Sequence, residues 1–306
     1  MERAVSEWTD LGDGIRVRRS RLFQMNSVLL ADRAHAVVVD PGVLPSEIED
    51  LARATRDTGA RDVTLLLTHA HWDHVLGRPW FPGARTLAHD RFEAELRRDL
   101  AHIHAEAGRY AAQHGEPFAK PFEPFAPDEA VSGLRFMKLD PWRLVLRDAA
   151  GHCSSQISIH LPERRTLIAA DMLSDIEIPA LDGPCAAYLA TLKTLEPVFE
   201  AGGVETLIPG HGAIVTDGAT ARRRLRQDLD YLRALESGVR EARTAGLTAE
   251  DAVARLAGLQ HGGRPIEGDY NLEAHRENVR LTWAGLSQRP VGPARRGPGG
   301  KYRTRK

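Results

Sequence analysis

The feature that most constrains this chain is a run of metal-ligand side chains directly after an apolar segment. Residues 62–67 read Asp-Val-Thr-Leu-Leu-Leu, a largely apolar run typical of a strand that is buried on both faces. Residues 68–74 follow as Thr-His-Ala-His-Trp-Asp-His and supply three imidazoles and a carboxylate. Zinc and similar divalent ions accept imidazole nitrogen and carboxylate oxygen as ligands. The two segments together predict an α/β fold with a metal site at the end of a buried strand.

Strand-like and helix-like segments alternate through the first two thirds of the chain. We predict strands at residues 15–18, 22–30, 36–39, 62–67, 134–138, 143–147, 156–160, 166–170 and 204–208. We predict helices at residues 45–58, 90–114 and 186–200, and then at 219–244, 248–257 and 271–286. This order predicts a mixed α/β domain that is followed by a helical region.

Three further ligand-type side chains stand just after predicted strands. His152 follows Ala-Ala-Gly at a strand exit, Asp171 directly follows another strand, and His211 lies in Pro-Gly-His-Gly after a third. Glycine and turn residues at such positions let the backbone approach a site closely. Taken singly, each residue has an ordinary explanation as a turn histidine, a helix N-cap or a loop residue. Their shared position at strand ends predicts that they join the same site as residues 68–74.

The motifs T-H-A-H-W-D-H, A-G-H-C-S-S-Q, A-A-D-M and P-G-H-G together resemble the metal-binding set of the metallo-β-lactamase-fold hydrolases. The earlier V-V-V-D-P-G resembles the strand and turn that precede the first motif in that family, and the resemblance covers roughly residues 14–216. It implies a four-layer αββα sandwich with a dinuclear site between two sheets. Carried over by position, it implies two ligand sets with a bridging carboxylate: His69, His71 and His152; Asp73, His74 and His211; and Asp171 between them.

A dinuclear site of this kind predicts metal-assisted hydrolysis. Two divalent ions hold a bridging water whose pKa falls from about 15.7 toward about 7, so hydroxide is present at neutral pH. The ions also polarise a carbonyl oxygen and stabilise the leaving group, while Asp73 orients the nucleophile or passes a proton. We therefore expect two Zn²⁺ ions, with iron or manganese as alternatives, and cleavage of a small acyl ester or thioester, with a lactone as a further option.

Departures from known relatives narrow the expected substrate. The β-lactamases of this fold carry Cys or Ser where this chain has Asp171, so the resemblance is to the glyoxalase II and thioesterase-like subset. Lactone-opening relatives carry a Tyr soon after the bridging Asp, and residues 172–177 contain none. The connection from His74 to His152 is longer than in glyoxalase II-like enzymes. It predicts a helical insert at about residues 78–130 that covers the site, and leaves open whether this insert is a mobile lid.

We predict three parts of the chain: a catalytic domain at residues 1–216, a C-terminal helical region at 217–288, and a disordered tail at 289–306. The tail carries seven basic side chains and no acidic one, so the remainder has a formal charge of about −8. In the helical region, His275 and Asn278 are candidates for the substrate pocket, although a core or surface position is the commoner explanation for such a histidine.

Composition argues against several classes of partner. An acidic body is a poor binder of polyanions, so we expect no specific nucleic-acid partner. No apolar run reaches the roughly 18 residues of a membrane helix, and the start of the chain does not resemble a secretory signal. Two cysteines, Cys153 and Cys185, form no disulfide framework. We expect a cytoplasmic protein with a small-molecule acyl substrate and no membrane partner, and a homodimer is one expectation because this architecture often dimerises.

Two other functions stay open for the same motifs. Mononuclear-iron sulfur dioxygenases of this fold have similar motifs, whereas diiron flavoproteins carry Glu in place of His71 and an added flavodoxin domain. A regulatory or binding protein that keeps its metals without turnover is the second alternative. Metal analysis with an oxygen-consumption assay separates hydrolysis from dioxygenation, and the exchange Asp73→Asn separates catalysis from binding.

Overall fold

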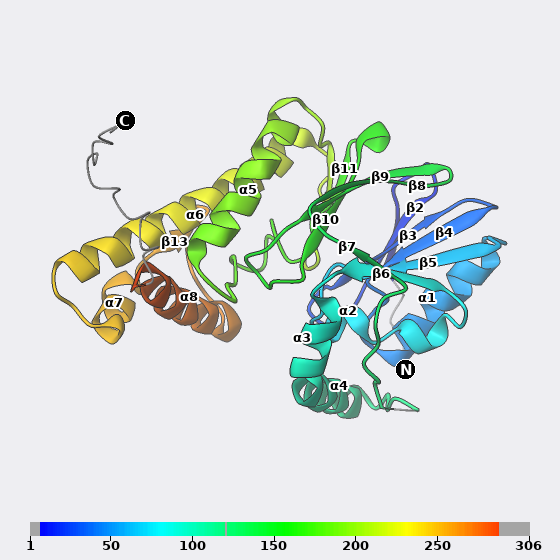
Figure 1. Cartoon of the computed structure of the whole chain (residues 1–306), viewed down its shortest axis with the longest axis horizontal. Helices are drawn as coiled ribbons and strands as arrows, with labels where there is room; N and C mark the ends of the chain where they lie inside the picture. Colours follow the sequence, from blue (N-terminus) through cyan, green and yellow to red (C-terminus); the bar gives the residue numbers. More distant parts are fainter. Residues whose placement is uncertain (1–6, 120, 288–306) are drawn as a thin grey trace, which may run out of the picture.

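Two β-sheets face each other, and helices cover the outer face of each sheet (Figure 1). The structure is a computed structural model that describes residues 7–119 and 121–287. The predicted tail at residues 289–306 lies outside the described residues. The layers are helix, sheet, sheet and helix, which confirms the predicted αββα sandwich with a helical C-terminal part.

The first sheet places the ends of its parallel strands along one edge. Its strands follow chain order: β1 (Glu7–Asp10), β2 (Ile15–Arg19), β3 (Asn26–Ala31), β4 (His35–Val39), β5 (Asp62–Leu66), β6 (Arg85–His89) and β7 (Glu129–Val131). Pairing is antiparallel from β1 to β4 and parallel from β4 to β7. Because parallel strands share one direction, the turns after β4 and β5 lie side by side.

The second sheet packs on the first through apolar side chains. Its order is β12 (Thr206–Ile208), β11 (Thr166–Ile168), β10 (Ile157–Leu161), β9 (Trp142–Asp148) and β8 (Leu134–Leu139). β11 and β12 are parallel, and the other pairs are antiparallel. Val17, Val37, Leu66, Leu146 and Ile159 belong to the buried cluster between the sheets. The central strands are buried on both faces, and successive residues pack alternately on the second sheet, as Val28 and Leu30 do, and under the helices, as Leu29 does.

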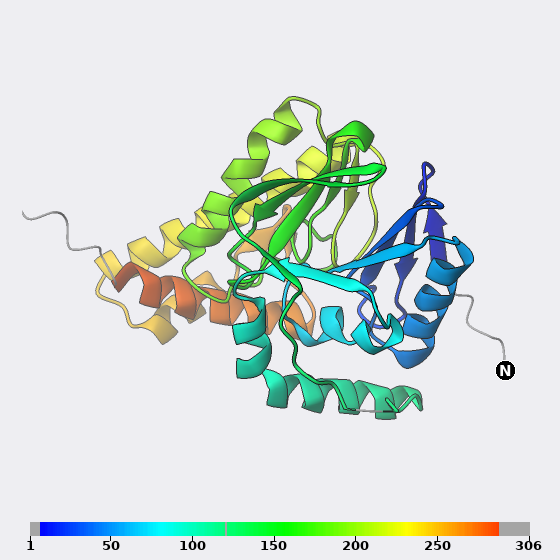
Figure 2. The ribbon, with the colours of Figure 1, turned by 45° about the vertical axis from the view of Figure 1, so that its right-hand side comes forward.

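Two groups of helices close the sandwich (Figures 1 and 2). The first sheet is covered by α1 (Pro45–Asp57), α2 (Trp72–Val75), α3 (Phe92–Arg98) and α4 (Leu100–His114). The second is covered by α5 (Cys185–Glu200) and α6 (Gly218–Thr244). Against these helices pack α7 (Ala249–Leu256), α8 (Asp269–Ser287) and a short hairpin of β13 (Gln260–His261) and β14 (Arg264–Pro265). Short 3-10 turns, η1 (Arg78–Trp80) and η2 (Pro162–Arg164), complete the elements. The second group forms one continuous apolar core with the second sheet, and α6 lies at its centre.

Several predicted elements differ from the structure in extent. The strand predicted at residues 22–30 begins only at Asn26, because Phe23 and Gln24 adopt positive φ angles of 54° and 49°. The helix predicted at 90–114 is divided at Asp99 into α3 and α4. The segment 78–130, predicted as a helical insert, also contributes β6 and β7 to the first sheet. These short strands lack a clear apolar alternation, so pairing with neighbours rather than local sequence determines them.

None of the helices described within residues 7–119 and 121–287 has the length and apolar character needed to cross a bilayer.

Candidate metal centre

The seven side chains predicted as ligands meet at one edge of the two sheets. Each comes from a turn or helix that begins where a strand ends, so the fold gathers side chains from residues 69 to 211. Most are buried, and the side chain of Asp171 is only 7% exposed. The residues are His69, His71, Asp73, His74, His152, Asp171 and His211.

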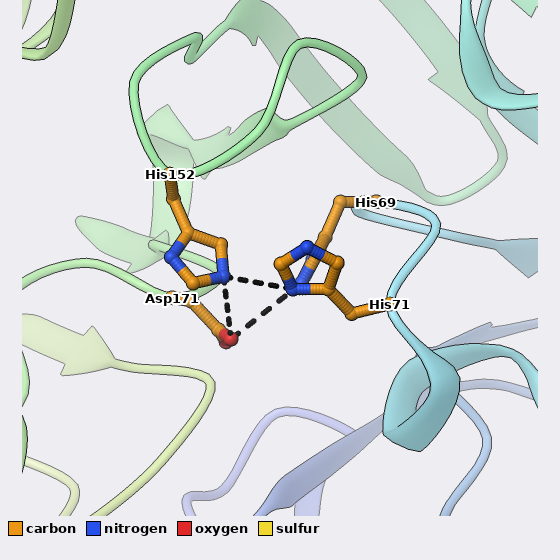
Figure 3. Close-up of side chains that lie close together, drawn as sticks. All are labelled: His69, His71, His152 and Asp171. Carbon is orange, nitrogen blue, oxygen red and sulfur yellow. Dashed lines mark hydrogen bonds and ion pairs between the residues drawn. The ribbon is translucent and has the colours of Figure 1, made fainter. Parts of the chain in front are cut away.

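One group of ligand atoms is shown in Figure 3. The Asp171 Oδ2 atom lies 3.3 Å from His152 Nε2 and 3.5 Å from His69 Nε2. The Nδ1 atom of His71 lies 2.9 Å from His152 Nε2. All four residues offer a ligand atom within 4.8 Å of the others. Three imidazoles and one carboxylate therefore converge on a single point between the sheets.

A second group lies on the other side of the same carboxylate. His211 Nε2 is 3.3 Å from Asp73 Oδ2, and His74 Nε2 is 3.8 Å from that oxygen. Asp171 Oδ1 lies 3.3 Å from His74 Nε2, and Asp171 Oδ2 lies 3.5 Å from His211 Nε2. Asp171 thus faces both groups of ligand atoms, which is the arrangement that a bridging carboxylate requires.

The unpaired atoms at this place fit a divalent cation. His69 Nε2, His74 Nε2 and Asp171 Oδ1 are buried and have no hydrogen-bond partner. Buried polar atoms rarely lack partners, because desolvation without a compensating contact is costly. A tetrahedral zinc ion with ligand bonds of about 2.0–2.2 Å separates its ligand atoms by about 3.3 Å. The observed separations of 3.3 to 3.5 Å between Asp171 and the imidazoles match this spacing. The clusters therefore suggest a divalent metal site.

Hydrogen bonds on the far side of three imidazoles hold their rings in place. His74 Nδ1 contacts Asp40 Oδ2 at 2.9 Å, and His211 Nδ1 donates to the Phe23 carbonyl at 3.0 Å. His152 Nδ1 donates to the Ala180 carbonyl at 3.2 Å. Such partners select the tautomer in which Nε2 carries a free lone pair for a metal.

Asp40 is a residue next to the candidate site that sequence reasoning treated only as part of a turn. Its carboxylate accepts hydrogen bonds from the Thr68 backbone N–H at 2.7 Å and from the Thr68 hydroxyl at 2.5 Å, in addition to His74. It therefore ties the turn after β4 to the turn after β5. An acidic residue at the end of a strand next to the motif strand is the signal that could have revealed it.

Two glycines in the ligand motifs allow close approach of the chain. A Cβ atom at Gly210 would collide with the carboxylate of Asp171. A Cβ atom at Gly151, whose φ is +144°, would collide with Tyr188. Only glycine fits both positions, which explains the small residues beside His152 and His211.

The buried charges determine the protonation of the site in the absence of a cation. Burial, together with neighbouring imidazoles, lowers the pKa of His69 and lowers that of His71 well below its ordinary value. Burial opposes ionisation of Asp171, but His74, His211 and His69 outweigh this effect and hold its pKa well below normal. The carboxylate is therefore ionised and His71 is neutral, the forms in which they bind metals.

The ligand atoms open into a cavity of about 830 Å³. Its aromatic wall consists of Trp72 and Tyr110, stacked at 5.2 Å between ring centroids, with Phe23 edge-on to Tyr110 at 5.0 Å. Tyr270 and Asn271, at the start of α8, line another side. This volume lies within the range of small-molecule sites, about 300–1,000 Å³.

The structure corrects the placement of His275 and Asn278, which do not line this cavity. His275 Nε2 donates to the Leu256 carbonyl at 2.9 Å, and its Nδ1 bonds with the Tyr231 hydroxyl at 2.9 Å. Asn278 Oδ1 accepts from the Leu181 backbone N–H at 2.9 Å. Both side chains are buried among helices and use their polar atoms there. The part of α8 that lines the cavity is its N-terminal end.

Tyr188 also has a role that the sequence did not reveal. It is fully buried in α5, and its hydroxyl donates to the backbone carbonyl of Asp171 at 3.1 Å. This hydrogen bond supports the turn that carries Asp171.

The sequence profile of the metallo-beta-lactamase superfamily matches residues 20–234, and the chain belongs to this superfamily. No curated protein matches the chain. The assignment to a glyoxalase II and thioesterase-like subset stays a prediction.

Solved structures share the fold at low identity. The stereoselective inverting sec-alkylsulfatase Pisa1 from Pseudomonas sp. matches with a TM-score of 0.68 at 16% identity, over 96% of this chain and 52% of that chain. The chain therefore spans about half the length of that protein. A metallo-beta-lactamase family protein from Thermus thermophilus matches with a TM-score of 0.59 at 22% identity, over 89% of this chain and 94% of that chain. A beta-lactamase domain protein from Burkholderia ambifaria matches with a TM-score of 0.61 at 18% identity, over 92% of this chain and 88% of that chain.

Proposed function

We propose that the protein is a dinuclear-metal hydrolase that cleaves a small acyl ester or thioester. The observation that carries this proposal is the position of Asp171, whose two oxygens lie 3.3 to 3.5 Å from imidazoles of both ligand groups. Bound divalent ions, zinc in our proposal, would supply a hydroxide nucleophile at neutral pH and polarise the substrate carbonyl.

The residues of the chain then orient and protonate the reactants. Asp73 lines the cavity, and its pKa is lowered because the nearby imidazoles of His74 and His211 outweigh the effect of burial. It is ionised at neutral pH, so it can accept a hydrogen bond from the nucleophilic water, take up the proton that this water loses, and deliver that proton to the leaving group. Asp40 keeps the His74 ring fixed during this transfer.

The cavity favours an apolar and uncharged substrate group. Trp72, Tyr110 and Ile103 offer an apolar wall next to the ligand atoms. Both arginines that line the cavity are paired, Arg98 with Asp99 and Arg109 with Glu106. A paired guanidinium contributes little net charge for recognising phosphate or carboxylate groups. We therefore expect a neutral acyl ester or thioester to be preferred over a polyanionic carrier such as coenzyme A.

A substrate screen on zinc-loaded protein tests the proposal. The panel contains aryl esters of increasing acyl length, acyl-coenzyme A, acyl-glutathione, lactones and alkyl sulfates. We expect hydrolysis of neutral esters or thioesters. We also expect a fall in kcat of about 10²–10⁴ for Asp73→Asn when the variant is assayed at a zinc content matched to that of the wild type, because Asp73 is also a candidate ligand. Asp57→Asn, at the exposed end of α1, is the matched control and should keep wild-type kcat.

Three results would contradict this function. The first is a protein with two bound metals per chain that hydrolyses no acyl substrate, and the second is selective cleavage of alkyl sulfates. The third is one iron ion per chain with oxygen consumption, which would favour the dioxygenase alternative.

A further inference from the structure

The backbone on both sides of Asp171 adopts an unusual conformation. Ala170 has a φ of +52° and Leu173 a φ of +61°, values that residues with side chains seldom adopt. Such conformations persist where the surrounding structure holds them, and they concentrate at functional sites. The question is which groups hold this turn.

Two side chains of α6 form hydrogen bonds with the backbone of Leu173, one with its N–H group and one with its carbonyl group. Asp228 Oδ2 accepts a hydrogen bond from the Leu173 backbone N–H at 3.0 Å. Arg224 Nη1 donates to the Leu173 carbonyl at 3.3 Å. The two residues are one helical turn apart, so they project toward the same loop. Both are buried, Arg224 at 7% and Asp228 at 1% exposed.

The same arginine also reaches the loop that carries His211. Arg224 Nη1 donates to the Ala213 carbonyl at 2.8 Å, and its Nη2 lies 3.2 Å from Asp175 Oδ1. Asp175 in turn accepts from the Ala213 N–H at 2.8 Å, and the Ser174 hydroxyl donates to the His211 carbonyl at 2.9 Å. The loop of the bridging carboxylate and the loop of His211 are therefore joined to each other and to α6.

The second oxygen of Asp228 is also occupied. Asp228 Oδ1 lies 2.8 Å from His261 Nε2, in β13. Both carboxylate oxygens thus have partners, which fixes the side chain in one orientation. Because α6 is packed at the centre of a continuous apolar core, it offers a rigid support that the turns themselves lack.

We propose that Arg224 and Asp228 are positioning residues of the metal centre. They set the places of the Asp171 carboxylate and the His211 imidazole without touching substrate. The inference rests on the metal centre of the proposed function, although not on the reaction or the substrate. Groups that hydrogen-bond directly to metal ligands typically contribute about 10–100-fold to metal affinity. We use the same range for Arg224 and Asp228, which act on the ligand loops through the backbone of Leu173 and Ala213.

Zinc affinity, measured by competition with a chromophoric chelator, tests the inference directly. We expect Asp228→Ala and Arg224→Met each to lower the affinity for the zinc ion at His211 and Asp171 by about 10–100-fold. The visible spectrum of the cobalt-substituted protein should change in the same variants, because the ligand geometry changes. Asp228→Asn keeps a carbonyl oxygen for the Leu173 N–H, so it should restore most of the affinity.

Tyr231→Phe is the matched control on the same helix. The Tyr231 hydroxyl bonds to His275 and Asn278 in α8 and to neither Leu173 nor Ala213, through which Arg224 and Asp228 act. Its loss should therefore lower thermal stability but leave zinc affinity unchanged. Wild-type affinity in Asp228→Ala and Arg224→Met would overturn the inference, and so would an equal loss in Tyr231→Phe. If Asp228→Ala does not fold, Arg224→Met and the comparison of Asp228→Asn with Tyr231→Phe decide the question.

The outcome is independent of the proposed reaction. A protein that binds two zinc ions but hydrolyses no acyl substrate would refute the proposed function, while the affinities of the variants would still support or overturn the positioning role. A wild-type protein that binds no zinc ion at Asp171 and His211 would overturn the positioning role itself.

Discussion

At the scale of single residues, Asp171 and Asp40 organise the site. Asp171 faces both ligand groups with its two oxygens, whereas Asp40 holds Thr68 and the ring of His74 from outside. A carboxylate in the interior is costly unless its oxygens are paired. The burial of both side chains is therefore consistent with a cation at Asp171 and with hydrogen bonds at Asp40.

Replacing Asp40 tests the role of these outer hydrogen bonds. Asp40→Ala leaves His74 Nδ1 and the Thr68 N–H without their acceptor, so the imidazole can rotate out of position. We expect zinc affinity to fall about 10–100-fold, as measured by chelator competition. The exposed Asp57→Asn serves as the control, and an Asp40→Ala protein with wild-type affinity would show that the ring is held by other contacts.

At the scale of elements, the helix α4 forms one wall of the cavity. Its residues Ile103 and Tyr110 line the cavity, and Tyr110 stacks on Trp72 of α2 with an interplanar angle of 7°. The stacked pair connects α4 to the ligand motif of residues 69–74.

Replacing Tyr110 with alanine tests whether this wall of the cavity contributes to substrate binding. Aromatic pairs contribute about 0.5–1.5 kcal/mol beyond the area that they bury, which corresponds to about 2–10-fold in binding. We expect Tyr110→Ala to raise KM for esters with apolar acyl groups by this factor while kcat changes little. His114→Ala, at the exposed end of α4, is the control. A fall in kcat without a change in KM would place Tyr110 in the chemistry rather than in substrate binding.

Sequence reasoning predicted that seven ligand-type side chains meet at one site, because their chemistry and their position at strand ends are local properties, and the structure brings these side chains together. It missed β6 and β7, since strands of three to five residues depend on pairing with neighbours. It placed His275 and Asn278 in the pocket because ligand-type chemistry on a helix does not indicate which face points inward. Helical packing of α8 against α6 decides this, and it buries both residues.

The cavity walls were also beyond local reasoning. Phe23, Tyr110 and Tyr270 come from a turn and two helices that are far apart in the sequence. Only the folded arrangement brings them to one cavity.

At the scale of the whole molecule, two halves meet at the metal centre. One half supplies residues 69–74 from the first sheet, and the other supplies His152, Asp171 and His211 from the second sheet. A cation bound across this junction binds the folded state and not the unfolded chain. Its binding therefore adds RT ln(1 + [L]/Kd) to the free energy of unfolding.

Metal removal tests this linkage. Zinc at about 100 times its Kd should stabilise the fold by about 2.7 kcal/mol. For a chain of this size we expect a chelator to lower Tm by several degrees, as measured by calorimetry, and added zinc to restore it. The variant Asp171→Ala should show a much smaller response, and an equal response in both proteins would mean that zinc acts elsewhere.

The most direct test of the account is the number and location of bound metal ions. Elemental analysis of the zinc-loaded protein, combined with anomalous diffraction at the zinc edge, provides both. The account predicts two ions per chain, one among His69, His71 and His152 and one among Asp73, His74 and His211, with Asp171 between them. A protein that binds no metal, or binds it away from Asp171, would contradict the account.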